Sequence, residues 1–422
     1  MNYNEALTYI HSICWKTTKP GLERTQYLLG KLGNPEKQLK YIHIAGTNGK
    51  GSTASMLSSI LEQAGYKVGL YTSPYINRFN ERMQVNHQQI PDEDVARYAD
   101  MMKPITDAMP DCPTEFELIT ATAMLYFAEQ KCDIVVLEVG MGGELDATNV
   151  IDASEAAVIT AMGFDHVKEL GPTMADIARA KAGIIKNGGE VVIYGGNEEA
   201  DPVFEETCRQ RNAGFHRPDF SQIVPGEFSL DGQTFSYKSW KDLRIPLVGS
   251  YQMNNASVVL ETVEVLRGKG WNISDENVRD GMANTSWPAR FEIMQRDPVF
   301  ILDGGHNPHG IRGTAQSLQR LFPGKKATFV TGVMADKDVE SILGLITPLA
   351  KEFYTVCPDN PRAMTAEELA LRIRALGVEA TPCASVAEGV EKAIAAEGKD
   401  GVVCALGSLY MSGEIRACFP EK

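Results

Sequence analysis

Short apolar segments alternate with helix-like segments along most of the chain. In the first half the apolar segments are residues 41–45, 68–71, 133–138, 156–160 and 190–194, and helical patterns lie between them, for example over 116–129 and 173–185. Continuous apolar strands separated by helices are typical of a parallel sheet that is covered on both faces. The pattern therefore predicts an α/β fold.

The alternation is interrupted once and then resumes. Residues 215–248 show short alternating strands with turns, which predicts a small antiparallel addition, and a helix is expected over about 253–267. The segment Trp287-Pro288-Ala289-Arg290 breaks the pattern, and apolar strands return at 299–303, 327–331, 353–356 and 402–405. We expect an N-terminal parallel-sheet domain over residues 1–288, including the antiparallel addition, and a smaller Rossmann-like domain over residues 289–422.

The segment 40–53 has the layout of a phosphate-binding loop. The apolar strand 41–45 runs into a glycine-rich turn, and a helix-compatible segment, 54–64, follows. Glycines let backbone N–H groups converge on phosphate oxygens, the helix offers its positive N-terminal end, and Lys50 adds a charge. The expected nucleotide contacts are Gly49, Lys50, Gly51 and Ser52. The alternative is a strand-to-helix turn that binds nothing.

This loop departs from the usual pattern G-x-x-x-x-G-K-[ST] at two positions. Ile44 stands where the first glycine belongs, and Gly51 separates Lys50 from Ser52. The hydroxyl that usually contacts Mg²⁺ is therefore displaced by one residue. We expect another side chain to hold the metal.

Polar groups also follow other apolar strands of the first half. Glu138 ends the segment 133–138 before a glycine-rich turn, where a carboxylate is suited to Mg²⁺ or is simply solvated. Asp165-His166 follows another strand, with a metal role and a structural role as alternatives. Together with Lys50 these residues can share one site. Lys181 lies between alanines on a predicted helix, which is typical of a solvent-facing side chain.

The second half carries one comparable segment, Asp303-Gly304-Gly305-His306-Asn307-Pro308, after a predicted strand. Asp303 is suited to a ribose hydroxyl or to a phosphate through water, and His306 to a phosphate. The alternative is a plain β–α turn, since Asp-Gly and Asn-Pro both form turns. Arg290, in the break between the predicted domains, is suited to transferring phosphates on domain closure or is a surface charge.

Composition narrows the class of protein. The 422 residues carry a formal net charge of −14 and no basic run, so we expect neither nucleic acid nor anionic membrane as a partner. No apolar stretch reaches the roughly 18 residues of a membrane span, and the first residues lack the features of a signal peptide, so we expect a cytoplasmic protein. The eight cysteines include no C-x-x-C pair, and we expect reduced, buried thiols.

Nine motifs then point to one family by their order along the chain. They are Gly46-Thr-Asn-Gly-Lys-Gly-Ser52, Thr72-Ser73-Pro74-Tyr75 through Arg82, Glu138-Val-Gly-Met-Gly-Gly-Glu-Leu-Asp146-Ala-Thr-Asn149, Asp165-His166, Lys181-Ala-Gly-Ile-Ile-Lys186, Trp287-Pro-Ala-Arg290, Asp303-Gly-Gly-His306-Asn307, Asp336-Lys-Asp338 and Gly407-Ser-Leu-Tyr410. With them the chain resembles folylpolyglutamate synthase/dihydrofolate synthase, a branch of the Mur ligase superfamily. The resemblance covers nearly the whole chain.

The resemblance implies roles for individual residues. Ser73 and Glu138 would hold one Mg²⁺, and His166 would hold a second with Lys181, which is carbamylated in this family; a monovalent cation is also possible. The implied ATP contacts are those of the loop together with Asn255, Arg290, Asp303 and His306, and the implied catalytic residues are Lys50, Lys181, His166 and Arg290. The implied substrate contacts are Thr114, Phe116, Glu117, Leu145, Asp146 and Ala147, with Gly21 to Arg24 as a further candidate segment.

Four positions depart from the family pattern. Tyr75 and Tyr251 replace usual histidines, Glu144 stands where arginine is frequent, and Ala180 replaces a frequent glutamate before the modified lysine. The implied metal and phosphate ligands are all present, so the resemblance still implies ATP-dependent ligation. The charge reversal at Glu144 lies beside the implied substrate contacts and bears on substrate preference.

The implied reaction is the ATP-dependent addition of L-glutamate to a folate or dihydropteroate carboxylate through an acyl phosphate, by an enzyme that acts as a monomer. Three alternatives remain open. A Mur ligase for another carboxylate normally has about 100 residues ahead of its phosphate loop, whereas 45 precede Gly46 here. A small-molecule kinase would release ADP without glutamate, and a nucleotide-binding regulator would lack an intact set of metal ligands.

Overall fold

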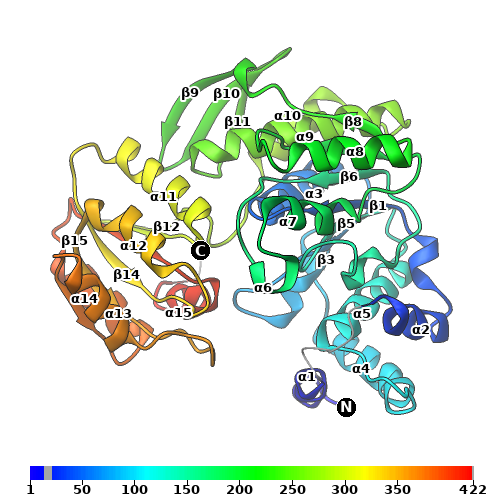
Figure 1. Cartoon of the computed structure of the whole chain (residues 1–422), viewed down its shortest axis with the longest axis horizontal. Coiled ribbons are helices and arrows are strands. Elements are labelled where there is room, and N and C mark those ends of the chain that lie inside the picture. The colour runs from blue at the N-terminus through cyan, green and yellow to red at the C-terminus, as the bar shows by residue number, and fades with distance from the viewer. Residues whose placement is uncertain (14–20, 421–422) are drawn as a thin grey trace. The chain divides into compact units, whose positions relative to one another are not determined.

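The chain forms two compact units, each built from more than one segment. A computed structural model of the chain describes residues 1–13 and 21–420. The first unit contains Met1–Ser221 and Asn254–Thr285, and the second contains Gln222–Met253 and Ser286–Lys422. In Figure 1 the green strands β9, β10 and β11 belong to the same unit as the yellow-to-red elements that follow residue 286. The sequence placed residues 222–253 with the N-terminal domain, whereas their contacts group them with the second unit.

The first unit is organised around one mixed sheet with the strand order β4-β3-β2-β5-β1-β6-β7-β8. Strands β2, β5, β1, β6, β7 and β8 run parallel, and β3 and β4 extend the sheet as antiparallel strands. The strands are β1 (Tyr41–Ala45), β2 (Val68–Tyr71), β3 (Met83–Val85), β4 (Gln88–Gln89), β5 (Ile134–Glu138), β6 (Ala156–Ile159), β7 (Glu190–Ile193) and β8 (Gly214–His216).

Helices cover both faces of this sheet, as a parallel sheet requires. The helices of the first unit are α1 (Tyr3–Ser12), α2 (Glu23–Lys31), α3 (Lys50–Gln63), α4 (Asp92–Asp107), α5 (Glu115–Glu129), α6 (Val167–Leu170), α7 (Met174–Ala182), α8 (Asp201–Arg211), α10 (Asp275–Ala283) and most of α9 (Ser250–Gly268). Side chains of β1 alternate between the faces: Tyr41 packs with α4 and α5 and Ala45 packs with α7 and α8, on one side. The intervening residues Ile42 and Ile44 face the other side.

Helix α3 is buried along most of its length. Its residues Gly51 to Leu61 are all buried, and α10 packs against it so closely that a Cβ on Gly281 would lie 2.4 Å from the Cα of Ile60. Ser59 also donates a 2.7 Å hydrogen bond to the carbonyl of Gly281. The helix that follows the glycine-rich loop is therefore held firmly, which fixes the direction of its first N–H groups.

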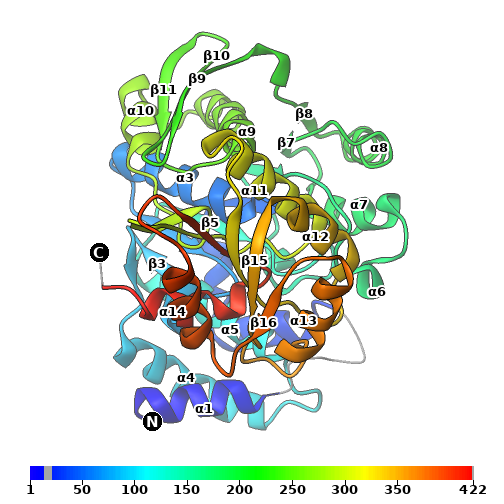
Figure 2. The same ribbon diagram turned by 90° about the vertical axis from the view of Figure 1, so that its left-hand side faces the viewer.

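The second unit carries a separate, mostly parallel sheet with the order β12-β13-β17-β14-β15-β16. Its strands are β12 (Glu292–Arg296), β13 (Val299–Leu302), β14 (Ala327–Thr331), β15 (Ala350–Thr355), β16 (Ala380–Pro382) and β17 (Val402–Leu406). Its helices are α11 (Pro308–Leu321), α12 (Val339–Ile346), α13 (Ala366–Ala375), α14 (Val386–Ala396) and α15 (Ser412–Ala417). Figure 2 shows α12 and α13 on the right of β15 and α14 on its left, so helices cover both faces.

A three-stranded antiparallel sheet, β9 (Ile223–Ser229), β10 (Gly232–Tyr237) and β11 (Trp240–Ile245), also belongs to the second unit. Asp231, in the turn between β9 and β10, forms an ion pair with Arg296 of β12. The guanidinium carbon of Arg320 lies 4.1 Å from the ring centroid of Phe228. These contacts explain why the segment groups with residues that follow it by more than sixty positions.

The sequence predicted β1, β2, β5, β6, β7, β13, β14, β15 and β17 to within a few residues but did not predict β3, β4, β12 or β16. The α/β class with a parallel N-terminal sheet is confirmed. One interpretation was wrong: Phe215 and His216 lie in β8, which pairs in parallel with β7, and not in the antiparallel addition. Cys132, Cys208, Cys383 and Cys404 are buried as expected, whereas Cys112, Cys357 and Cys418 are exposed; Cys14 lies outside the described residues. In the part of the chain that is described, no helix combines the length and apolar character needed to cross a membrane.

Candidate active site

The candidate residues of the first unit meet at one edge of its sheet. Strand β1 lies between β5 and β6, with Ile44 beside Glu138 and Ala45 beside Ile159. Because these strands are parallel, the segments that follow them leave the sheet at the same edge. The glycine-rich loop, Glu138 and Asp165-His166 therefore emerge side by side, as predicted.

The loop between β1 and α3 needs glycine at two positions. Gly46 has φ +146° and a Cβ there would lie 1.9 Å from Oγ1 of Thr160; Gly49 has φ +89° and a Cβ there would lie 2.7 Å from Oδ1 of Asn255. The amides of Thr47 and Asn48 both donate to the carbonyl of Ala161, at 3.0 and 3.1 Å. The loop is thus tied to the segment after β6, and the predicted nucleotide contact Asn255, a buried residue of α9, lies against its second glycine.

Two lysines meet at one carbonyl oxygen of this loop. Nζ of Lys181 donates to the carbonyl of Gly46 at 2.8 Å, and Nζ of Lys50 donates to the same oxygen at 3.3 Å. Lys181 is only 4% exposed, so the expectation of a solvent-facing side chain was wrong. Burial and the nearby charge of Lys50 lower the pKa of Lys181 to about 7, against the opposing effect of Asp165 and Asp146.

The glycine-rich turn after β5 places the helix of Lys181. A Cβ on Gly143 would lie 2.9 Å from the carbonyl of Ala180 and 3.0 Å from that of Lys181, and a Cβ on Gly183 would lie 2.3 Å from the Cα of Glu144. The amide of Glu144 donates to the carbonyl of Ala180 at 2.7 Å. The backbones of the turn and of α7 therefore touch, which only glycine allows at these positions.

Glu138 and Ser73 lie together, as the resemblance implies. The backbone amide of Ser73 donates a 3.0 Å hydrogen bond to Oε2 of Glu138, which is 4% exposed at the end of β5. His166 lies at the start of α6 with φ +51°, and its exposed ring has Nε2 4.0 Å from Oδ1 of Asp165. Among the described residues, no three His, Cys, Asp or Glu side chains are placed to coordinate one metal ion together. A cation here would need hydroxyl or modified-lysine oxygens as well.

The implied substrate residues divide into two groups. Thr114 caps α5 and forms a capping box with Glu117, whose carboxylate also pairs with Arg24 at 2.7 and 2.9 Å. Phe116 lies under the glycine-rich turn, since a Cβ on Gly140 would come within 2.6 Å of its ring. Thr114 and Glu117 therefore hold the first turn of α5 in place through hydrogen bonds that are largely buried. Residues 14–20, next to Arg24, lie outside the described part of the chain.

The second group follows the glycine-rich turn. Leu145 is 54% exposed, while Asp146 and Ala147 are buried. Oδ2 of Asp146 accepts from the amide of Met141 at 2.9 Å, and Oδ1 accepts from the amide and hydroxyl of Thr148 at 3.1 and 2.6 Å. The carboxylate of Asp146 therefore links Met141, before it in the turn, to Thr148, after it.

Sequence reasoning missed a residue behind this group. His43, in the middle of β1, is fully buried, and its Nε2 lies 2.9 Å from Oγ1 of Thr148. Its Nδ1 has no hydrogen-bond partner within the described structure. A histidine inside the otherwise apolar run Tyr41-Ile42-His43-Ile44-Ala45 was the signal that could have revealed it.

The remaining candidates lie in the second unit. Asp303, 2% exposed, accepts from the amides of Phe291 and Gly305 and from the hydroxyl of Thr314, at 2.8 to 2.9 Å. Nη1 of Arg290 donates to the carbonyl of Ala289 at 2.9 Å. Nδ1 of His306 lies 2.9 Å from the carbonyl of Gly304. Tyr251, which replaces a usual histidine, is near this group. Burial and the charge of Asp303 raise the pKa of its phenol, while the charge of Arg290 opposes this.

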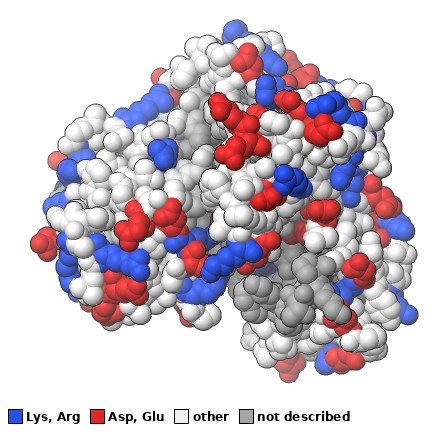
Figure 3. All heavy atoms as spheres, in the orientation of Figure 1, with Lys and Arg blue, Asp and Glu red and all other residues white. Residues whose placement is uncertain are grey.

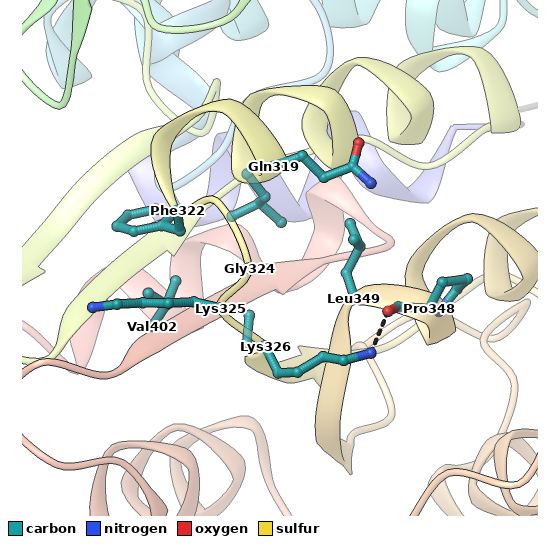
Figure 4. Close-up of a pocket in the computed structure, with 10 residues that line it drawn as sticks. Gln319, Phe322, Gly324, Lys325, Lys326, Pro348, Leu349 and Val402 are labelled. Carbon is teal, nitrogen blue, oxygen red and sulfur yellow. Dashed lines mark hydrogen bonds between the residues drawn. The ribbon is translucent and has the colours of Figure 1, made fainter.

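The second unit also contains a small hollow, which is lined by other residues (Figure 4). It encloses about 220 Å³ and is lined by Leu318, Phe322, Lys326, Ala327, Leu349 and Val402, with the ammonium of Lys326 bonded to the carbonyl of Pro348. Ala327 and Val402 begin β14 and β17, whereas Asp303 and His306 follow the carboxyl end of the parallel strand β13. The hollow is thus at the opposite edge of the sheet, and it is smaller than the roughly 300–1,000 Å³ of most ligand pockets.

On the face shown in Figure 3, Lys and Arg side chains of the described residues are interspersed with Asp and Glu. Exposed pairs such as Arg97–Glu129 and Lys103–Asp107 are examples of this mixing.

Comparisons with known proteins agree with this arrangement. Residues 44–263 match the family model of the Mur ligase middle domain, and residues 289–409 match that of the Mur ligase glutamate ligase domain. The chain is 36% identical over 426 residues to the dihydrofolate synthase/folylpolyglutamate synthase of Bacillus subtilis, with 98% of each chain covered. It is 36% identical over 431 residues to the folylpolyglutamate synthase of Lacticaseibacillus casei, covering 99% of this chain and 98% of that one.

A solved structure extends the similarity to three dimensions. The Escherichia coli FolC protein in complex with DHPP and ADP superimposes with a TM-score of 0.88 at 30% identity, covering 99% of this chain and 97% of that one. Both units of the present chain are therefore included in the match.

Proposed function

Because this chain belongs to the Mur ligase family, in its folylpolyglutamate and dihydrofolate synthase branch, we propose that it is an ATP-dependent ligase that adds L-glutamate to the carboxylate of a folate or dihydropteroate substrate. ATP is the proposed co-substrate, and ADP and phosphate are the proposed products. The relatives that carry ADP support nucleotide binding at the loop between β1 and α3.

The observation that carries this proposal is the meeting of Lys50 and Lys181 at the carbonyl of Gly46. A buried lysine beside a second cation is unfavourable unless its charge is removed or compensated. A phosphate loop compensates it with anionic oxygens, and a carbamate on Lys181 would replace the cation with two oxygen ligands. The same geometry would be costly in a protein that binds nothing at this edge.

The residues present fit a nucleotide with Mg²⁺. Close packing of Gly46 against Thr160 and of Gly49 against Asn255 fixes the course of the loop backbone. The proposed donor set is rich in oxygen, as Mg²⁺ requires. We assign one metal to Ser73 and Glu138 and a second to His166 and carbamylated Lys181. When bound, the metals would neutralise charge on the transferring phosphoryl group. A bound monovalent cation, a monomeric state and a cytoplasmic location stay predictions.

The chain's own residues would act by positioning and by charge. The N–H groups of Gly49 to Ser52 and the ammonium of Lys50 hold the phosphates of ATP, and Asn255 fixes the shape of the loop. A substrate carboxylate oxygen attacks the γ-phosphorus, the bond to the β–γ bridging oxygen breaks, and ADP leaves. Arg290, Asp303 and His306 of the second unit are assigned to the nucleotide.

The second step needs no protein nucleophile. The amine of L-glutamate attacks the acyl carbon, a C–N bond forms, the C–O bond to phosphate breaks, and the amine loses a proton. Exclusion of water protects the acyl phosphate until glutamate arrives. Thr114, Phe116, Glu117, Leu145, Asp146 and Ala147 are assigned to the pteroyl side of the substrate.

Glutamate-dependent ADP release by the purified chain tests the proposal. Dihydropteroate and tetrahydrofolate are offered in parallel with ATP and Mg²⁺. Turnover with either substrate, dependent on glutamate, is the expected result and also defines which addition the enzyme performs. ADP release without glutamate would favour a kinase, and no release with either substrate would overturn the folate assignment.

A further inference from the structure

A continuous chain of hydrogen bonds runs from the core of the first unit to the turn after β5. It links Nε2 of His43 to Oγ1 of Thr148 at 2.9 Å, and Oγ1 of Thr148 to Oδ1 of Asp146 at 2.6 Å. Oδ2 of Asp146 then accepts from the amide of Met141 at 2.9 Å. His43 belongs to β1, the strand that leads into the phosphate loop. The hydrogen bonds therefore connect that strand to Asp146, which is assigned to the pteroyl side of the substrate.

The direction of each bond follows from counting protons. A threonine hydroxyl has one proton, and here it is donated to the carboxylate of Asp146. Oγ1 can therefore only accept from His43, which must carry its proton on Nε2. Nδ1 is then a bare lone pair in the core, which is consistent with its having no partner among the described residues. The opposite direction would bury an unpaired N–H donor, which is more costly.

Burial makes this arrangement sensitive to the hydroxyl of Thr148. Both His43 and Thr148 are 0% exposed, and Asp146 is 8% exposed. Burial raises the pKa of Asp146 above its usual value, and the hydrogen bonds from Thr148, Met141 and Gly140 offset this only in part. Removing the hydroxyl takes away one of the donors that favour the charged carboxylate.

We propose that His43 and Thr148 are positioning residues that keep the Asp146 carboxylate charged and oriented for the pteroyl side of the substrate. The proposal rests on the proposed function for the role of Asp146, and it adds two residues that do not touch the substrate themselves. Because His43 carries its proton on Nε2, each hydrogen bond of the series is donated toward Asp146.

Isosteric variants separate positioning from packing. Thr148→Val removes the hydroxyl and keeps the shape, whereas Thr148→Ser keeps the hydroxyl. His43→Leu removes the donor, whereas His43→Gln keeps an N–H at the position of Nε2. We expect Thr148→Val, which removes a donor to a charged carboxylate, to raise the KM for the pteroyl substrate by roughly tenfold or more. His43→Leu, which removes a bond to a neutral hydroxyl, should raise the same KM by a smaller factor. The KM for ATP should not change, and Thr148→Ser and His43→Gln should recover most of the loss.

The Asp146→Asn background provides the decisive control. If the two residues act through Asp146, Thr148→Val should have no further effect on the KM for the pteroyl substrate in that background. An equal effect with and without Asp146, or a lower melting temperature with unchanged KM, would show a merely structural role and overturn the proposal.

A measurement without substrate keeps this test independent of the proposed function. ¹⁵N NMR of histidine-labelled protein, with the His43 signals identified by their loss in His43→Gln, should show the Nε2–H tautomer in the wild type and a change in Thr148→Val. The Nδ1–H tautomer, or no change in the variant, would overturn the proposal. If the wild type turned over neither folate nor dihydropteroate, the proposed function would fail. The NMR measurement would still show whether the hydrogen bonds from His43 through Thr148 to Asp146 exist.

Discussion

The ammonium of Lys181 donates a 2.8 Å hydrogen bond to the carbonyl oxygen of Gly46, across 135 positions of sequence. This contact brings the end of α7 against the first residue of the phosphate loop. Lys50 reaches the same oxygen, so the loop backbone lies between two cations.

Lys181 should carry a carbamate. Its pKa of about 7 leaves much of the amine neutral near pH 7, and only a neutral amine can attack CO₂, forming an N–C bond and releasing a proton. ¹³C NMR of protein equilibrated with ¹³C-bicarbonate should show a carbamate signal that Lys181→Arg abolishes. Lys168→Arg, which alters a lysine of α6 that is exposed, serves as the control. A signal that persists in Lys181→Arg would refute the assignment.

Glu138→Gln should lose ligase activity while the fold is retained. The amide has nearly the same shape and can still accept from the amide of Ser73, but it removes the charge proposed to bind Mg²⁺. Losing a few kcal/mol of metal binding corresponds to a fall in turnover of roughly 100-fold or more at fixed Mg²⁺. Steady-state ADP release across a Mg²⁺ titration measures this. Glu93→Gln, at an exposed position of α4, should behave as wild type; near-normal turnover of Glu138→Gln would contradict the metal assignment.

Gly49→Ala should impair nucleotide binding and stability, and Gly65→Ala is its matched control. The two glycines have nearly equal φ, +89° and +86°, but a Cβ at Gly49 would lie 2.7 Å from Asn255, whereas at Gly65 nothing lies within 4 Å. Both variants share the backbone strain of about 1–2 kcal/mol. Gly49→Ala should therefore be the less stable in denaturant titrations and the weaker in ATP binding by calorimetry. Equal losses in both variants would mean that the contact with Asn255 is unimportant.

His43 should make the free energy of unfolding fall at acidic pH. Burial lowers its pKa to about 3, against 6.5 in the unfolded chain, so the unfolded state binds one more proton between these values. Stability from this group is complete above pH 6.5 and is lost as the pH falls, by about 3 kcal/mol between pH 7 and pH 4. Urea titrations over this range should show a steeper fall for wild type than for His43→Gln. Parallel curves would show that His43 is already protonated in the fold.

The contributions of Arg24 and Glu117 to the free energy of unfolding should be coupled. Their side chains are 6% and 8% exposed, and breaking such a buried pair by removing one partner typically costs about 3–5 kcal/mol. Arg24→Met and Glu117→Gln should each be strongly destabilising in denaturant titrations, and the double variant should be less destabilised than the sum. Additive losses would indicate that the pair contributes little coupling.

The inner strands of the two large sheets were predictable because they are mostly apolar runs, whereas β3, β4, β12 and β16 are short or polar and were not predicted. The loop was predictable because strand, glycines, lysine and helix follow one another directly. The burial of Lys181 was not, since its two alanine neighbours are equally typical of an exposed helix and its partner Gly46 lies far away in sequence. Likewise, β8 has only three residues, and its pairing with β7 cannot be inferred from so short a pattern.

The membership of residues 222–253 illustrates the same limit. Their alternating pattern predicted the antiparallel strands, but the unit to which they belong depends on Arg296 meeting Asp231 and Arg320 meeting Phe228. Asp231, Arg296 and Arg320 are exposed and Phe228 is half-buried, and the sequence around them gives no signal of these distant contacts. Residues 14–20, beside the candidate segment that ends at Arg24, lie outside the described structure.

The interleaving of the two units has a consequence for the order in which the protein can mature on the ribosome. The chain leaves the first unit after Ser221, returns at Asn254 and leaves it again after Thr285. Helix α10, which packs against α3 behind the phosphate loop, is therefore synthesised long after the loop itself. Since domains generally fold as units during synthesis, α3 would lack its covering helix α10 until translation has passed residue 285. A nascent chain stalled before that point would expose the apolar side of α3 to chaperones.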